Sequence, residues 1–119
     1  MDPVYETSFA LRAPDADFRA AWRPSAIFTA MQELGESDSA RWNVGYFALR
    51  KKGLAWVITR ALLQIDRAPV IGETIVARTW PGKPRHAIYP RYYQFQDSDG
   101  QVFARASTLW VLMDIAARE

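Results

Sequence analysis

Apolar and polar positions alternate at the start of the chain, over residues 4–13. A period of two predicts a β-strand with one buried face. The side chains expected on that face are Tyr5, Thr7, Phe9 and Leu11. The alternation ends in the run Ala13–Asp17, and we expect a loop from there to Arg23.

The period changes after residue 23. Pro24 suits the first turn of a helix, where its missing N–H group is no loss. Apolar residues then recur at spacings of three and four, which predicts a helix from 24 to about 40. Its buried stripe would contain Ile27, Met31 and Leu34, with Ala30 beside them. Residues 43–53 have no clear period and are expected to be irregular.

Four further strands are predicted in the second half of the chain, where β-branched and aromatic residues are concentrated. Their ranges are 54–67, 73–80, 86–96 and 101–113. Prolines and glycines separate the first three, and Asp97–Gly100 reads as a hairpin turn. Pro90 cannot donate a backbone hydrogen bond, so it favours an edge position or a bulge for its strand.

The order strand, helix and four strands predicts an α+β fold, in which long antiparallel strands each bury one face against a single long helix. A length of 119 residues, half of them hydrophobic, favours a single domain covering residues 1–119. No stretch approaches the roughly 20 apolar residues of a membrane span. The N-terminus also lacks the basic start and apolar run of a signal peptide.

Charge and cysteine content narrow the function classes. The net charge is only +2, and the basic residues are spread along the chain, which argues against a nucleic-acid partner. The chain has no cysteine, which excludes disulfides, thiolate zinc sites and a cysteine nucleophile and fits a reducing cytoplasm. Metal-binding histidine spacings are absent too, because His86 is the single histidine.

Several motifs match one known protein family in order and spacing. Residues 53–60, Gly-Leu-Ala-Trp-Val-Ile-Thr-Arg, are similar to the Gly-x-x-Trp-Val-x-x-Arg strand of acyl-ACP thioesterases. The segment from Pro69 to Pro81, with Gly72-Glu73 and Thr79-Trp80, resembles the next strand of that family. Matching positions continue in register through Arg91, Asp97, Gly100, Ala106-Ser107 and the run Trp110–Asp114, and upstream through Leu11-Arg12, Asp17 and Gln32-Glu33.

The resemblance implies a hot-dog fold, a five-stranded antiparallel sheet wrapped around one long helix. The family pairs two hot-dog domains in tandem and carries its catalytic acid, Asn and His in the second one. The sequence ends at Glu119, where the connection to that domain would begin, so the resemblance implies the substrate-selecting half. No cofactor and no metal are expected. One departure is Asp38, where many relatives have a His.

The implied partners are a fatty acyl thioester, as acyl-ACP or acyl-CoA, the acyl carrier protein, and a second hot-dog domain or a second copy of the chain. The Arg50-Lys51-Lys52 corner and the turn from Lys83 to Arg85 are candidates for attracting the phosphopantetheine arm and the acidic carrier, although such surface clusters are mostly solvated.

Catalytic candidates within this chain are carboxylates. Single-domain hot-dog thioesterases use one Asp or Glu, in the loop before the helix or on the helix itself. The loop candidates are Asp15 and Asp17, which could equally cap a turn or the helix start. The helix candidate is Glu33, which could equally be an ordinary exposed residue. His86 follows a proline-rich turn and is expected to be solvated.

A second set of residues is predicted to contact substrate. The tryptophans and arginines of the strands would line an acyl tunnel and its mouth, and Gln32 would border it from the helix. Alternatively the tryptophans fill the core, and the arginines pair with Asp66 or Asp114, because an Arg in an apolar strand needs a partner. The candidates are Gln32, Trp56, Arg60, Trp80, Arg91 and Trp110.

Three functions therefore remain open from the sequence. The first is the acyl-binding half of an acyl-ACP thioesterase. The second is a self-contained homodimeric thioesterase that uses Asp17 or Glu33. The third is a non-catalytic acyl-binding or assembly module.

Overall fold

Within residues 3–117, the chain forms one five-stranded antiparallel sheet, two α-helices and one short 3-10 helix. A computed structural model describes residues 3–117, so Glu119 lies outside the described residues. Neighbouring strands pair in the order β1-β3-β4-β5-β2. The α+β architecture predicted from the sequence is confirmed. The elements are β1 (Tyr5–Ala10), α1 (Pro24–Arg41), α2 (Tyr46–Arg50), β2 (Leu54–Ile65), β3 (Thr74–Pro81), β4 (Tyr89–Gln96) and β5 (Val102–Asp114).

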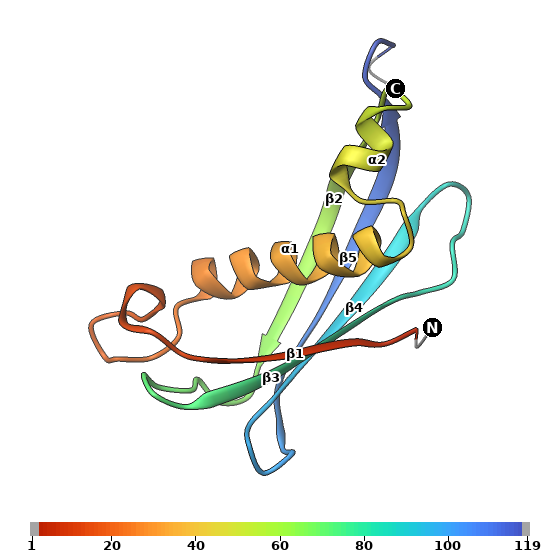
Figure 1. Cartoon of the computed structure of the whole chain (residues 1–119). Helices are drawn as coiled ribbons and strands as arrows, with labels where there is room; N and C mark the ends of the chain where they lie inside the picture. Colours follow the sequence, from red (N-terminus) through yellow and green to blue (C-terminus); the bar gives the residue numbers. More distant parts are fainter. Residues whose placement is uncertain (1–2, 118–119) are drawn as a thin grey trace.

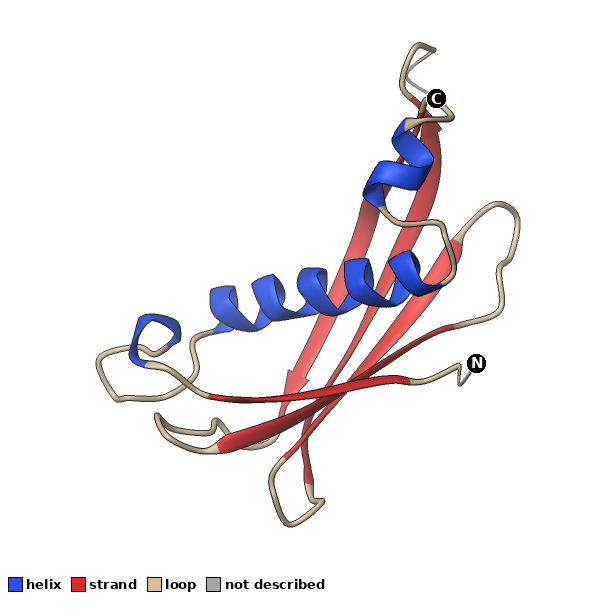
Figure 2. Ribbon diagram, viewed as in Figure 1, coloured by secondary structure: helices blue, strands red, loops and turns tan. Residues whose placement is uncertain are grey.

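Helix α1 lies across one face of the twisted sheet, and α2 follows it on the same side (Figures 1 and 2). The predicted stripe of Ile27, Met31 and Leu34 is buried against the sheet. Trp22 enters the same core from the loop before α1 and makes an edge-to-face contact with Phe95 at a centroid distance of 5.3 Å. Neither α1 nor α2 combines the length and the hydropathy that a membrane crossing requires.

The hydrophobic core lies between α1 and this face of the sheet. Strand residues reach it at every second position, as the pleat requires, except at the bulge of β5, where the consecutive residues Phe103 and Ala104 are both buried. Their buried members are Ile75, Ala77, Tyr93, Phe95, Phe103, Ala104 and Ala106. The turn 97–100 forms as predicted, with Gly100 at a φ of 83° and its N–H bonded to the Asp97 carbonyl.

Two segments differ from the prediction. Strand β1 ends at Ala10, earlier than expected, and a short 3-10 helix follows at Ala13–Asp15. The segment 43–53 is not irregular throughout, because it contains α2. Gly45 permits this turn, since an added Cβ would lie 3.1 Å from the Ala40 Cα atom. The Glu36 carboxylate accepts the N–H of Tyr46 at 2.9 Å and so holds the first turn of α2.

The prediction for Pro90 was wrong. Its strand, β4, is the central strand of the sheet, and the register shift beside Phe95 and Gln96 comes from an extra residue on β5, Phe103, and not from a bulge in β4. Pro90 is tolerated because it is the second residue of β4, just outside the ladder with β3, whose last pair joins Pro81 to Arg91.

A bulge in β2 changes the direction of its side chains. The register with β5 shifts between Ile58, opposite Trp110, and Arg60, opposite Leu109. Without the bulge, Arg60 would lie on the same face as Trp56 and Ile58. One extra residue instead places Arg60 on the opposite face of the sheet, and its side chain is exposed.

Candidate functional site

A pocket of about 590 Å³ opens between α1 and the ends of the central strands. Gly35 and Ser39 on α1, Leu49 on α2 and Arg91 on β4 are its buried lining residues. Around them the lining consists mainly of aromatic and proline side chains. The others are Pro3, Gln32, Glu36, Trp42, Val44, Trp56, Pro81, Gly82, Pro84, Tyr89, Pro90, Trp110 and Leu112.

Four of the six residues predicted to contact substrate meet in this pocket, although they come from four different elements. They are Gln32, Trp56, Arg91 and Trp110. The two others lie on the opposite face of the sheet. Arg60 is turned there by the bulge, and Trp80 follows the core-facing Thr79 and packs on Tyr92 at a ring distance of 6.2 Å.

The pocket tryptophans turn their apolar rings to the pocket because their N–H groups already have acceptors. Trp56 Nε1 donates to the Val44 carbonyl at 3.0 Å, and Trp110 Nε1 donates to Thr108 Oγ1 at 2.7 Å. Trp56 also packs edge-on against Tyr89, with ring centroids 5.1 Å apart. A half-buried indole with a satisfied N–H is a stable apolar wall.

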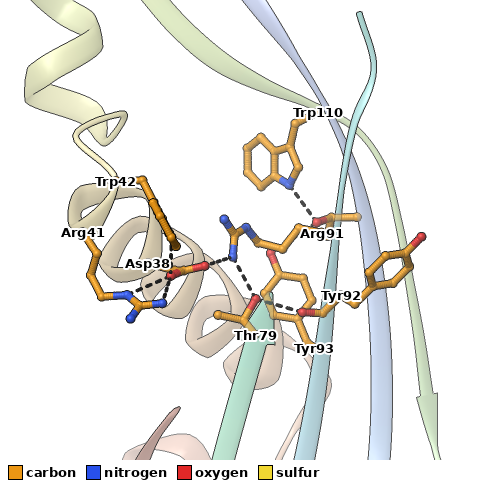
Figure 3. A network of polar contacts seen from close by, with 9 residues as sticks. Asp38, Arg41, Trp42, Thr79, Arg91, Tyr92, Tyr93 and Trp110 are labelled. Atoms are coloured by element: carbon orange, nitrogen blue, oxygen red, sulfur yellow. Dashed lines mark hydrogen bonds and ion pairs between the residues drawn. The ribbon is translucent and has the colours of Figure 1, made fainter. Parts of the chain in front are cut away.

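Arg91 is the charged group on the buried side of the pocket (Figure 3). Its Nη1 atom donates to Asp38 Oδ2 at 2.7 Å and to Thr79 Oγ1 at 3.1 Å. Asp38 is completely buried, and its other oxygen accepts from Arg41 Nη2 at 2.6 Å and from Trp42 Nε1 at 3.3 Å. The carboxylate therefore joins the end of α1 to the central strand.

This network corrects the partners expected for the strand arginines. Arg91 pairs with Asp38 instead of Asp66 or Asp114. Asp66 pairs with Arg105 at 3.4 Å on the surface, and Asp114 accepts backbone N–H groups of Ala116 and Ala117. Arg60 forms no ion pair within residues 3–117.

The carboxylates predicted as catalytic candidates lie elsewhere. Glu33 and Asp15 both line a second groove, of about 550 Å³, between the other flank of α1 and β1. Asp15 also faces Arg12 at 3.8 Å. Gln32 and Glu33, adjacent in sequence, thus face different grooves on the two flanks of one helix.

Asp17 is engaged in its own loop. Its Oδ1 atom accepts the backbone N–H groups of Arg19 at 2.8 Å and Ala21 at 3.2 Å, so it caps this turn and not the start of α1. His86 is exposed, as expected, in a two-residue turn closed by hydrogen bonds between Arg85 and Ile88. The structure does not bring His86 together with any of the three carboxylates.

Two residues of the site were not predicted. Asp38 continues the spacing of the buried stripe, four residues after Leu34, and a carboxylate there must find a cation. That spacing indicates that Asp38 needs a cation beside it, but it does not identify Arg91 as that cation. Thr79, the second partner of Arg91, had no comparable feature in the sequence, because threonine is common in strands.

Comparison with known proteins agrees with this architecture. The acyl-ACP thioesterase N-terminal domain family matches residues 2–119. The chain belongs to this family. A palmitoyl-acyl carrier protein thioesterase of Arabidopsis thaliana, a chloroplast protein, is 32% identical over 97% of this chain. A chloroplast acyl-[acyl-carrier-protein] hydrolase of Cuphea viscosissima is 26% identical over 98% of the chain.

The chain spans about 30% of the length of each of these two relatives. Among solved structures, an acyl-ACP thioesterase from Bacteroides thetaiotaomicron superimposes with a TM-score of 0.94 at 17% identity, over 98% of this chain and 48% of that one. This likeness confirms the hot-dog fold that was predicted. In this chain, the domain consists of the five-stranded sheet with α1 across one face, and a groove lies on each flank of α1.

Proposed function

We propose that this chain is the acyl-binding part of an acyl-ACP thioesterase, and that the pocket between α1 and the central strands holds the fatty acyl chain. The observation that carries the proposal is the lining of that pocket, in which aromatic, proline and leucine side chains from five elements converge. A concave apolar site of this size is typical of pockets for small apolar ligands.

The energetic argument concerns methylene groups. Each CH₂ group removed from water contributes about 0.8 kcal/mol, which corresponds to about a fourfold gain in affinity. An acyl chain that enters between Trp56 and Trp110 loses its water shell without meeting an unpaired indole N–H. Affinity should therefore rise with chain length until the chain fills the pocket.

The charges around the pocket support a thioester of an acidic carrier as the substrate. Pro84 lines the pocket and stands between Lys83 and Arg85, while Leu49 lines it from the other side and precedes the Arg50–Lys52 corner. Positive charge on both sides of an opening favours the approach of phosphate and of an acidic protein surface. Acyl-CoA carries phosphates as well and would be attracted by the same charges.

Pairing with a second hot-dog unit is part of the proposal. Strand β2 has 12 residues and, among the strands of residues 3–117, pairs on one side only, with β5, so its other edge is open to a further strand. The second unit would be another domain or another copy of the chain. In this proposal the pair supplies the hydrolytic groups and works in a reducing compartment such as the cytoplasm.

The test is to titrate saturated fatty acids of increasing length into the protein. Binding is measured as the change in fluorescence of the pocket tryptophans. Leu112→Trp fills the pocket and should weaken binding more than tenfold. Leu109→Trp is the matched control, because Leu109 lies on the same strand but faces the other side of the sheet. Equal binding by both variants would place the acyl chain elsewhere and overturn the proposal.

A second candidate function rests on the other groove. Glu33 and Asp15 line it together, next to the exposed flank of α1, so a carboxylate there has access to a substrate from solvent. A homodimer could use Glu33 as a general base for thioester hydrolysis. This candidate requires turnover by the purified chain, whereas the first requires binding alone.

A further inference from the structure

Only one of the three nitrogens of the Arg91 guanidinium group donates hydrogen bonds within residues 3–117. Both of its hydrogen bonds leave from Nη1, which thereby uses both of its protons, toward Asp38 and Thr79. Nη2 and Nε, with three N–H groups between them, bond no atom of residues 3–117. Figure 3 shows the second terminal nitrogen pointing away from Asp38, to the side where Trp110 lies.

These free donors face the pocket. Within residues 3–117, no fully buried side-chain nitrogen or oxygen lacks a hydrogen-bond partner, so the unbonded nitrogens of Arg91 are not sealed inside the protein. Arg91 is nevertheless only 9% exposed and lines the pocket together with the buried Gly35 and Ser39. The more exposed lining residues, such as Gln32, Trp42 and Pro84, mark the rim. The free donors therefore belong to the floor.

We propose that this floor is an oxygen-binding subsite, in which Arg91 selects acyl chains that carry a hydroxyl or keto group near their distal end. The inference rests on the proposed acyl-binding function. A methyl group pressed against Arg91 would strip water from three charged donors and replace none of those hydrogen bonds, which is costly. A hydroxyl or carbonyl oxygen would accept from Nη2 or Nε and restore one of them.

Asp38 has a positioning role in this subsite. It offsets part of the charge of Arg91, since the same carboxylate also pairs with Arg41. The free N–H groups of Arg91 can then bond a neutral hydroxyl or carbonyl oxygen. Its bond to Nη1, together with that of Thr79, fixes the plane of the guanidinium and hence the direction of the free edge. Ser39, which is buried on the same floor, offers a hydroxyl close to the end of the ligand.

The test compares dodecanoate with its 12-hydroxy and 3-hydroxy forms, each titrated into the full chain as its methyl ester (named below by the parent acid), so that no ligand carries a carboxylate that Arg91 could bind instead. The 12-hydroxy acid should bind about tenfold more tightly than dodecanoate, and the 3-hydroxy acid should gain nothing. In Arg91→Lys, a compact ammonium replaces the planar fork and the preference should fall to about twofold or less. The double change Asp38→Leu with Arg91→Met removes the pair without leaving a lone buried charge, and should favour dodecanoate.

Arg41→Lys is the matched control, because Arg41 bonds the same carboxylate but does not line the pocket. It should keep the tenfold preference, and thermal unfolding of each variant verifies that it folds. Equal binding of dodecanoate and its 12-hydroxy form would overturn the subsite while leaving the acyl pocket standing. A preference for the 3-hydroxy form, or one that survives in Arg91→Lys, would overturn it too. Failure of all three acids to bind would instead reject the proposed acyl-binding function.

Discussion

Asp38 and Arg91, 53 positions apart in sequence, form a buried ion pair with 2.7 Å between Oδ2 and Nη1. The pair fastens the last turns of α1 to the central strand of the sheet. Both oxygens of the carboxylate accept hydrogen bonds, because Arg41 and Trp42 donate to Oδ1. Complete hydrogen bonding of this kind is what makes a charge tolerable in an apolar interior.

Removal of Asp38 alone should strongly destabilise the fold. Asp38→Ala leaves the Arg91 guanidinium buried without its counter-charge, and we expect a loss of about 3–5 kcal/mol in the free energy of unfolding. Urea denaturation measures it. Asp66→Ala is the matched control, since it breaks the exposed pair with Arg105 and should cost at most about 1 kcal/mol. Similar losses in both variants would mean that the buried pair contributes no more to the free energy of unfolding than the exposed pair does.

The sequence predicted the fold better than the site. Helical periodicity located α1, and the concentration of β-branched and aromatic residues located the four later strands, each to within a few residues. Arg60 was misplaced, since one bulged residue reverses the direction of all the side chains that follow in β2, and nothing in residues 54–67 marks that bulge. The partner of Arg91 lies on another element, so strand periodicity alone could not show it.

Arg60→Leu should therefore be nearly neutral. The side chain is exposed on the face opposite the pocket, and exposed substitutions without a specific partner usually change the free energy of unfolding by less than about 0.5 kcal/mol. Fatty acid binding should also be unchanged. Denaturation and ligand titration measure the two quantities, with Arg91→Lys as the comparison. A marked loss of fatty acid binding in Arg60→Leu would show that Arg60 contacts the substrate after all.

Burial raises the pKa of the Tyr93 hydroxyl above its ordinary value of 10.0, although its hydrogen bond to Thr108 acts in the opposite direction. A raised pKa in the folded state means that the unfolded chain releases this proton first. The contribution of Tyr93 to stability is then fully present below pH 10 and is lost as the pH rises above it.

Tyr93→Phe should remove that part of the alkaline loss of stability. Below pH 10 the variant should be less stable by about 1 kcal/mol, because the hydrogen bond at 3.2 Å to Thr108 is gone. Above pH 10 the gap to the wild type should narrow. Denaturation curves between pH 7 and 11 measure this, with Tyr92→Phe on the other face of β4 as the control. A gap that stays constant with pH would contradict the assignment to Tyr93.

The open edge of β2 leads us to expect a dimer or a larger assembly at micromolar concentration, measured by sedimentation velocity. Leu62 is 55% exposed in the middle of β2, so Leu62→Lys should weaken the assembly without unfolding the chain. Ser8→Lys is the matched control on β1, the other edge strand. A compact monomer in the wild type would remove the homodimeric enzyme from consideration.

Hydrolysis by the chain alone is expected to be slow or undetectable, while acyl binding is retained. The reason is geometric. His86 is exposed in the turn before β4, Asp17 is occupied by backbone N–H groups of its loop, and Asp15 faces Arg12. Glu33 remains as a carboxylate in an accessible groove, without a histidine beside it. A missing general base typically costs about 10²–10⁴-fold in rate.

A panel of long-chain acyl-ACP and acyl-CoA thioesters measures this activity, with Glu33→Gln and Asp17→Asn as the informative variants. Residual hydrolysis that both variants leave unchanged would agree with a chain that binds acyl groups and relies on a second unit for catalysis. Turnover of several per second that Glu33→Gln abolishes would reverse the order of the two proposed functions. The groove beside β1 would then be the active site, because Glu33 is the candidate that reaches it from α1. Abolition by Asp17→Asn alone would instead implicate the loop before α1, where the lost carboxylate also holds the turn from Arg19 to Ala21, so its unfolding curve must accompany the rate.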